Sequence, residues 1–317
     1  MSLSITARAM AIAAASVVAW SARAAAPPVV DPEATVVQEL VVVAKTPGPA
    51  WWRVSSPTSS VFILGTIGAL SKGQKWNTST ARRRLEGANE LIGPPRVTAG
   101  LGDIFALLGI RGHFRSKSPM EDSLPADLRA RFIADRPTVS PDPKAYSAWT
   151  PLAAGLLMVG DFRRRARLDP TEPQATVVRL AHGQGVTVAP AGTYRAVPVL
   201  RAAESGLATS GPVCLADALD EIEAGAGMAR AAAEGWARGD VGAALSASRG
   251  YEKCVNSLPE GADVVTRAMN DTTSAIVQAL AKPGHSVAVV NLRTLLARGG
   301  VIERLKAQGY KVVTPDQ

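Results

Sequence analysis

Val61-Phe62-Ile63-Leu64-Gly65-Thr66-Ile67-Gly68 holds the strongest structural signal in the chain. It is an apolar run of strand length that ends in a glycine turn. An earlier apolar run, Trp51-Trp52-Arg53-Val54, is separated from it by the turn-forming residues Ser56-Pro57-Thr58-Ser59. Two apolar runs joined by such residues are typical of a β-hairpin. We therefore expect the folded part of the chain to begin with a hairpin near Trp51.

This hairpin opens a strand–turn–helix–strand unit, and a similar unit ends the chain. In the first, residues 77–88 have helical spacing and lead to an apolar pair, 91–92. In the last, a buried-strand run at 286–290 is followed by a helical stretch, 301–308, a glycine stop and a final strand at 310–313. We expect an α/β (mixed α+β) fold in which these two units form one central sheet.

The middle of the chain is predicted to be a helical insert, because its apolar residues recur at helical spacing and its later part is rich in alanine. One short strand, 186–188, interrupts it. The predicted helices cover residues 101–110, 125–134, 151–165, 171 to about 183, 215–247 and 262–280.

The first 24 residues are typical of a secretory signal. Arg8 precedes an uncharged run, 9–20, and small residues follow to Ala24. A helix of that length is too short to cross ~30 Å of hydrocarbon, which takes about 20 residues, whereas a basic start and a small-residue end are typical of a cleaved signal peptide. We expect residues 1–24 to be removed and the protein to be exported, most simply to the periplasm, without a later membrane span. A non-cleaved N-terminal anchor is the alternative.

Residues 25–50 are rich in Pro and Val and end in Thr46-Pro47-Gly48-Pro49, so we expect a disordered leader there. The remainder, 51–317, is expected to form a single domain with a helical middle region.

The chain has 35 basic and 27 acidic residues, a formal charge of +8 that falls to +6 when Arg8 and Arg23 leave with the signal. The densest basic clusters, 82–84 and 163–165, stand beside apolar positions at helical spacing, which is typical of a solvated helix face; weak attraction to anionic surfaces is the alternative. Only four Tyr and five Phe are present. This number is too small for aromatic residues interleaved with basic ones, so a nucleic-acid partner is not expected.

Cys214 and Cys254 are the two cysteines of the chain. An even pair in an exported protein predicts a structural disulfide. The alternative, a thiol nucleophile, needs a nearby histidine, and the three histidines form no such local motif with either cysteine.

Several segments together carry a resemblance to a known family. They are Trp52-Arg53-Val54, 61–67, Trp149-Thr150-Pro151-Leu152, Gly183-Gln184-Gly185-Val186 and 287–313. In this order and spacing they resemble the TraB/GumN family of metallohydrolases, which includes the Tiki-type metalloproteases. The resemblance implies an α/β core whose strand ends carry two Gly-x-x-His motifs and supporting carboxylates that hold a divalent metal for hydrolysis.

The motif positions implied by that resemblance lack the metal-binding side chains. The first Gly-x-x-His begins at Gly65 and ends at Gly68, and the second begins at Asn291, passes through Arg293 and ends at Thr294. The two glutamate positions hold Pro94 and Gly192. Because none of these can supply a neutral nitrogen donor, we expect no catalytic residue and no metal or other cofactor, and we expect the strand ends near Gly68 and Asn291 to lie side by side.

The three histidines do not form a relocated site in the sequence. His113 follows a predicted helix, His182 is near a helix end, where the helix dipole favours it, and His285 is expected in a turn. We also find no Gly-x-Ser-x-Gly elbow, phosphate loop or dinucleotide-binding motif.

These observations predict an exported TraB/GumN-like pseudoenzyme, a non-catalytic pseudo-hydrolase whose former site binds an unknown small molecule or protein. A metal-dependent hydrolase or protease with relocated ligands is one alternative, and it requires at least two convergent carboxylate or imidazole groups near Gly68 and Thr294. A structural or interaction protein with a vestigial pocket is another, which an exposed apolar patch would favour.

Overall fold

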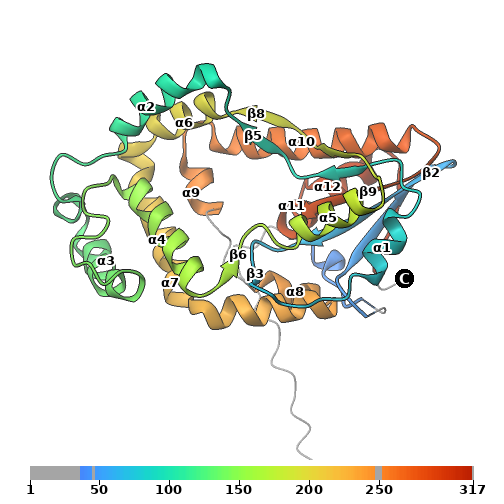
Figure 1. The fold of residues 1–317 in the computed structure, drawn as a ribbon, viewed down its shortest axis with the longest axis horizontal. Helices are drawn as coiled ribbons and strands as arrows, with labels where there is room; N and C mark the ends of the chain where they lie inside the picture. The colour runs from blue at the N-terminus through green and yellow to red at the C-terminus, as the bar shows by residue number, and fades with distance from the viewer. Residues whose placement is uncertain (1–35, 45–46, 247–251, 316–317) are drawn as a thin grey trace, which may run out of the picture.

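The computed structural model describes residues 36–44, 47–246 and 252–315 (Figure 1). The predicted signal peptide, 1–24, and the first part of the predicted leader, 25–35, lie outside the described residues. None of the helices in the described ranges is long and apolar enough to span a membrane.

The central sheet, within the described residues, has six strands in the order β10-β1-β2-β9-β4-β7. β10 and β1 pair antiparallel, as do β1 and β2, whereas β2, β9, β4 and β7 run parallel to one another. The two ends of the chain thus form one sheet, as predicted. The strands are β1 (Trp51–Ser55), β2 (Ser59–Thr66), β4 (Leu91–Gly93), β7 (Val188–Pro190), β9 (Gly284–Asn291) and β10 (Lys311–Val313).

β2 and β9 form the centre of the sheet and have apolar runs at 61–64 and 287–290, because parallel strands covered on both faces bury successive side chains. Val61, Ile63, Leu64 and 287–290 are all buried. In the parallel register Thr66 lies opposite Asn291, and adjacent strands are about 4.8 Å apart. The two strand ends are therefore neighbours, which confirms that expectation.

Helices cover the sheet in two groups. α1 and α5 pack on each other, with α1 against β9 and α5 against β4 and β7. α10 packs against β2, β9 and α12, and α11 links β9 to α12. These helices are α1 (Ser79–Leu85), α5 (Gln174–Gly183), α10 (Gly261–Leu280), α11 (Leu292–Leu296) and α12 (Val301–Ala307).

The helical insert extends away from the sheet on the left of Figure 1 and has a second core between α3, α4 and α7. Its interior includes the buried side chains of Phe132, Met158 and Leu215. The helices of the insert are α2 (Ile104–His113), α3 (Ala126–Val139), α4 (Pro151–Arg165), α6 (Ala196–Ser205), α7 (Leu207–Arg238), α8 (Val241–Leu245) and α9 (Glu252–Ser257).

Several short elements were not predicted, because two- and three-residue strands carry too little periodicity to detect. β3 (Leu70–Ser71) pairs with β6 (Leu168–Asp169), and β5 (Arg96–Thr98) pairs with β8 (Thr193–Arg195). The short helical turns η1 (Gln38–Leu40) and η3 (Met120–Ser123) were not predicted either, whereas η2 (Leu101–Asp103) is the first turn of the predicted helix 101–110.

The long predicted helix 215–247 is in fact two helices with a kink in the first. α7 is broken at Gly225, whose φ of 76° and ψ of 165° lie in a region that is essentially restricted to glycine. α7 ends before Gly239, which has a φ of 82° and allows the chain to turn into α8.

Part of the segment expected to be a disordered leader, 25–50, packs on the domain. Val36 and Leu40 are buried in the main core. Val36 forms a β-bridge with Ala297, and Val43 forms another with Asp240. The structure differs from the expectation here because residues 36–42 supply apolar side chains to the core, whereas the interpretation as a leader rested on composition alone.

Gly65 is closely packed within β2. A Cβ atom added there would be 2.3 Å from Cδ2 of Leu292 and 2.8 Å from Cζ3 of Trp52. Both neighbours are buried, so neither can turn away into solvent. The Gly65 carbonyl oxygen accepts a buried hydrogen bond of 2.7 Å from Nε1 of Trp236, near the end of α7. Gly65 therefore joins the sheet, α11 and the helical insert.

Cys214 on α7 and Cys254 on α9 have sulfur atoms 2.01 Å apart, which is disulfide distance. Both residues are buried and pack with Leu152 of α4. The backbone N–H of Cys254 donates a 3.0 Å hydrogen bond to Asp217, and burial raises the pKa of that carboxyl above its usual value. The Cys214–Cys254 pair thus holds the short helix α9 against α7.

We predict that Gly65→Ala lowers the free energy of unfolding by about 1–3 kcal/mol, because its methyl group overpacks a rigid site. Gly68→Ala is the matched control: a Cβ atom there meets no atom within 4 Å, so the change should be within about 0.5 kcal/mol. Urea unfolding of the three proteins measures both effects. Equal midpoints for Gly65→Ala and wild type would contradict the packing argument.

We also predict that the denatured, unreduced protein prepared from an oxidising compartment has no titratable thiol. The crosslink spans a sequence separation of 40 residues, so its reduction should cost about 4 kcal/mol on the chain-entropy estimate, less if the unfolded chain keeps structure. Thiol titration and urea unfolding with and without reductant test this. Two titratable thiols in the unreduced protein would rule out the disulfide.

Candidate functional site

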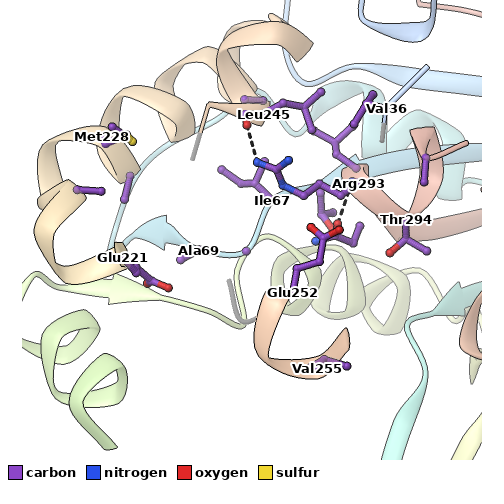
Figure 2. A pocket seen from close by; sticks show the side chains of 18 of the residues that line it. Val36, Ile67, Ala69, Glu221, Met228, Leu245, Glu252, Val255, Arg293 and Thr294 are labelled. Carbon is purple, nitrogen blue, oxygen red and sulfur yellow. Dashed lines mark hydrogen bonds between the residues drawn. The ribbon is translucent and has the colours of Figure 1, made fainter. Parts of the chain in front are cut away.

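A cavity of about 620 Å³ lies beyond the carboxyl ends of β2 and β9. In open sheets with parallel strands, this edge is where ligands bind, because the strands end there and the connections leave a crevice. The sheet supplies one wall of the cavity and the helical insert supplies the opposite wall. Its lining comes from the residues after β2 and β9 and from α4, α7, α8, α9 and α10 (Figure 2).

The turn after β2 gives the cavity an open wall. Ile67, Gly68 and Ala69 all line it. Gly68 is exposed, and an added Cβ atom would meet no atom within 4 Å. The space that a histidine side chain would take at this position is therefore part of the cavity.

The segment after β9 supplies the neighbouring wall. Asn291 ends the strand and caps α11, because its Oδ1 accepts a 2.9 Å hydrogen bond from the backbone N–H of Arg293. The Arg293 side chain crosses to α8, where Nη2 donates to the carbonyl oxygen of Leu245 over 2.6 Å (Figure 2). Thr294 is half-buried and also lines the cavity. Gly68, Asn291, Arg293 and Thr294 are thus brought to one site.

Pro94 and Gly192 follow β4 and β7, so they lie at the same edge of the sheet but do not line this cavity. They are close to each other in the fold, since the N–H of Arg96 donates to the carbonyl oxygen of Gly192 over 2.9 Å. A Cβ atom at Gly192 would be 2.9 Å from a carboxylate oxygen of Asp271. Gly65 lies inside β2 and contributes packing instead of cavity surface.

Two carboxylates line the cavity, Glu221 from α7 and Glu252 from α9. Glu221 is largely buried and accepts two hydrogen bonds from Arg163, of 2.6 and 2.7 Å. Such a bidentate pair satisfies both carboxylate oxygens. Figure 2 shows the Glu252 side chain pointing toward the α11 side of the cavity, where Arg293 and Thr294 lie.

The donors present do not fit the two-imidazole metal site that the resemblance implies. Gly68 offers no donor, Thr294 offers a hydroxyl group, and Glu221 is held by Arg163. Zinc in proteins takes imidazole, thiolate and carboxylate ligands, most often four. Within the described residues, no group of three or more His, Cys, Asp or Glu side chains is placed to hold a metal ion.

None of the three histidines lines the cavity. His113, at the end of α2, contacts the carboxylate of Glu204 on α6. His182 is exposed in the last turn of α5. His285 was expected in a turn but lies in β9, because β9 begins at Gly284 to pair with the start of β2; its Nε2 is 3.1 Å from the carbonyl oxygen of Arg84.

The interpretation of both arginine clusters as solvated helix faces is wrong for one member of each. Arg163 pairs with Glu221 at the cavity, as described above. The Arg84 guanidinium lies over the rings of Trp51 and Phe62, at 4.7 and 4.6 Å from their centroids, and burial lowers its pKa to about 10. Composition could not distinguish Arg84 and Arg163 from the exposed arginines beside them, since the residues that these two contact are distant in sequence.

Sequence reasoning also missed the part of the lining that the insert and α10 supply. It includes Met228 on α7, Glu252 and Val255 on α9, and Met269 on α10. These residues belong to three helices that no local motif connects, so only the tertiary fold reveals them. Gly225 could have indicated a break in the predicted helix, because a glycine inside a helical pattern lowers helix propensity. This glycine breaks α7 and itself lines the cavity.

Comparison with known proteins assigns the chain to a family. The profile described as the TraB/PrgY/gumN family matches residues 50–314, which include all six strands of the central sheet and the whole insert. No curated protein and no solved structure matches the chain. From the extent of the family match, the chain belongs to the TraB/PrgY/gumN family.

Proposed function

We propose that the chain is an exported pseudo-hydrolase of this family, which binds a ligand in the strand-end cavity and does not carry out metal-dependent hydrolysis. One observation carries the proposal. The cavity lies where the two motifs converge, yet its walls present Gly68 and Thr294 at the positions where the resemblance implies histidines.

The cavity is suited to a small organic ligand with an apolar body and a polar end. Its volume, about 620 Å³, falls in the range of roughly 300–1,000 Å³ that is usual for small-molecule sites. Apolar side chains from the insert form much of the wall, while Arg293, Glu252 and Asn256 supply polar groups. The apolar lining residues include Val36, Ile67, Phe162, Leu168, Met228, Leu245, Val255, Val265, Met269 and Leu292.

Export, with the periplasm as the compartment, is part of the same proposal. It rests on the signal-like residues 1–24 and on the cysteine pair, since disulfides persist in oxidising compartments. The sulfur atoms of Cys214 and Cys254 at disulfide distance support it.

The alternative of a hydrolase with relocated ligands has a specific observation in its favour, because Glu221 and Glu252 both line the cavity. The Arg163 pair weakens this alternative, since Glu221 would have to give up two short hydrogen bonds to bind a metal. Breaking a largely buried ion pair costs several kcal/mol. Glu252 alone is too few ligands for a tight site.

We predict that the purified protein holds no stoichiometric zinc or manganese and gains no peptide-hydrolysing activity when either ion is added. The physical reason is that Gly68 and Thr294 supply no imidazole nitrogen to coordinate the metal ion. Elemental analysis and a peptide-hydrolysis assay measure this.

One tightly bound ion per chain, with activity that a chelator abolishes, would overturn the non-catalytic proposal. Loss of that ion in Glu252→Gln and Glu221→Gln would then assign the relocated ligands. Asp135→Asn, whose carboxylate is on α3 outside the cavity, is the matched control and should leave such an ion in place.

A second prediction concerns the cavity itself. The amphiphilic anion 8-anilinonaphthalene-1-sulfonate should bind at a saturable site in the cavity that Gly68→Phe removes, because the new ring fills open space in the wall. Gly183→Phe, at an exposed position of α5 where a Cβ atom also meets no atom within 4 Å, is the matched control and should bind like wild type. Unchanged binding to Gly68→Phe would show that the cavity is not the binding site.

A further inference from the structure

α2 carries an exposed apolar stripe at the outer edge of the insert. Leu101 in η2 and Ile104, Phe105 and Leu108 in α2 are 88, 47, 85 and 60% exposed. These positions are spaced i, i+3, i+4 and i+7, so they share one helix face. Burying apolar side chains is the main favourable term in folding, and four large ones left in water on one face indicate an interaction surface.

The opposite side of α2 is the one that packs on the protein. Figure 1 places α2 at the top left of the molecule, with α6 beneath it. α2 packs against α6, and Ile110, five residues after Phe105 and on another side of the helix, is buried. α2 therefore has a packed face of its own, and the exposed stripe is a second, separate face.

The charges around the stripe are basic. Arg111 lies in the last turn of α2 and Arg201 lies on α6, while Arg115 follows α2 and places its guanidinium 3.8 Å from the centroid of the Trp149 ring; all three are exposed. Nearby acidic groups are already paired, because Asp103 accepts a 2.7 Å hydrogen bond from Arg195, and Glu204 contacts His113. Among the described residues, Arg111 and Arg201 form no ion pair. The surface is thus apolar at its centre and positively charged at its border.

We propose that this surface, defined as Leu101, Ile104, Phe105 and Leu108 with Arg111, Arg115 and Arg201, binds the surface of an anionic lipid bilayer. An interfacial helix of this kind lies in the membrane plane, buries its apolar face among the headgroups and keeps basic residues near the phosphates. α2 has ten residues and is ~15 Å long, which suits binding along the surface and not spanning.

A second copy of the chain fits this surface less well than a bilayer does. A two-fold interface brings the same patch of both copies together, so it would gather the basic groups of both copies, Arg111 and Arg201 among them, in one place. No unpaired carboxylate among the described neighbours, Asp103 and Glu204, is left to neutralise them. An anionic bilayer supplies both the apolar interior and the negative charge.

The test is co-sedimentation of the purified chain with vesicles of phosphatidylglycerol and phosphatidylethanolamine, and with vesicles of phosphatidylcholine alone. Wild type should bind the anionic vesicles, and its binding should weaken as salt is raised, since basic residues attract an anionic surface only within a Debye length. Phe105→Ser/Leu108→Ser should lower the partition coefficient by about tenfold or more. Arg111→Ser/Arg201→Ser should lower it by about fivefold for each residue at low salt.

Leu156→Ser/Leu157→Ser is the matched control, because these two leucines on α4 are also exposed, at 52 and 40%, but lie outside the surface. It should bind vesicles like wild type, and circular dichroism should show that all variants remain folded. Failure of wild type to bind anionic vesicles would overturn the proposal. A lipid-free dimer that Phe105→Ser/Leu108→Ser converts to a monomer would also overturn it and assign the surface to a second copy.

Discussion

The close approach of three buried groups to Gly65 is the constraint on which the rest of the structure depends. Trp52 and Leu292 occupy the space that any side chain at this position would need, and Trp236 donates to its carbonyl oxygen. Because β1 begins at Trp51, opposite Leu64, β2 has no β1 neighbour beyond that residue. The indole of Trp236 therefore satisfies a carbonyl group beyond the end of that pairing and docks the insert at the strand end where the cavity opens.

The fold could be predicted largely from apolar patterning, because its longest elements have unambiguous periods. The expected strand 286–290 lies within β9, and the expected helix 151–165 matches α4. Patterning failed where an element is short or its energy comes from distant partners. β5 and β8 have three residues each, and the apolar side chains of 36–42 are stabilised by a core that no local window contains.

The candidate site divides in the same way. Gly68 follows β2, while Asn291 ends β9 and Thr294 follows it; because the parallel pairing of these two strands can be predicted, the meeting of the three residues follows from topology. Glu221, Glu252 and Met228 come from the insert, and their convergence depends on how α7 bends and where α9 is held. No spacing in the sequence encodes that geometry. The sequence identifies the sheet wall of the cavity, and the tertiary structure is needed for the opposite wall.

The two walls of the cavity also differ in the ligands that they can accommodate. On the sheet wall, Gly68 has free space around it, and only Gly65 beneath is fixed by packing. A histidine at Gly68 is therefore compatible with the fold. Core packing does not require a glycine at this position, so the lack of a histidine there is a feature of the site itself. On the insert wall, Arg163 neutralises Glu221, and both carboxylate oxygens of Glu221 accept hydrogen bonds from Arg163. Open space on one side and a neutralised charge on the other favour a bound organic molecule over a hard cation, which requires several free oxygen ligands.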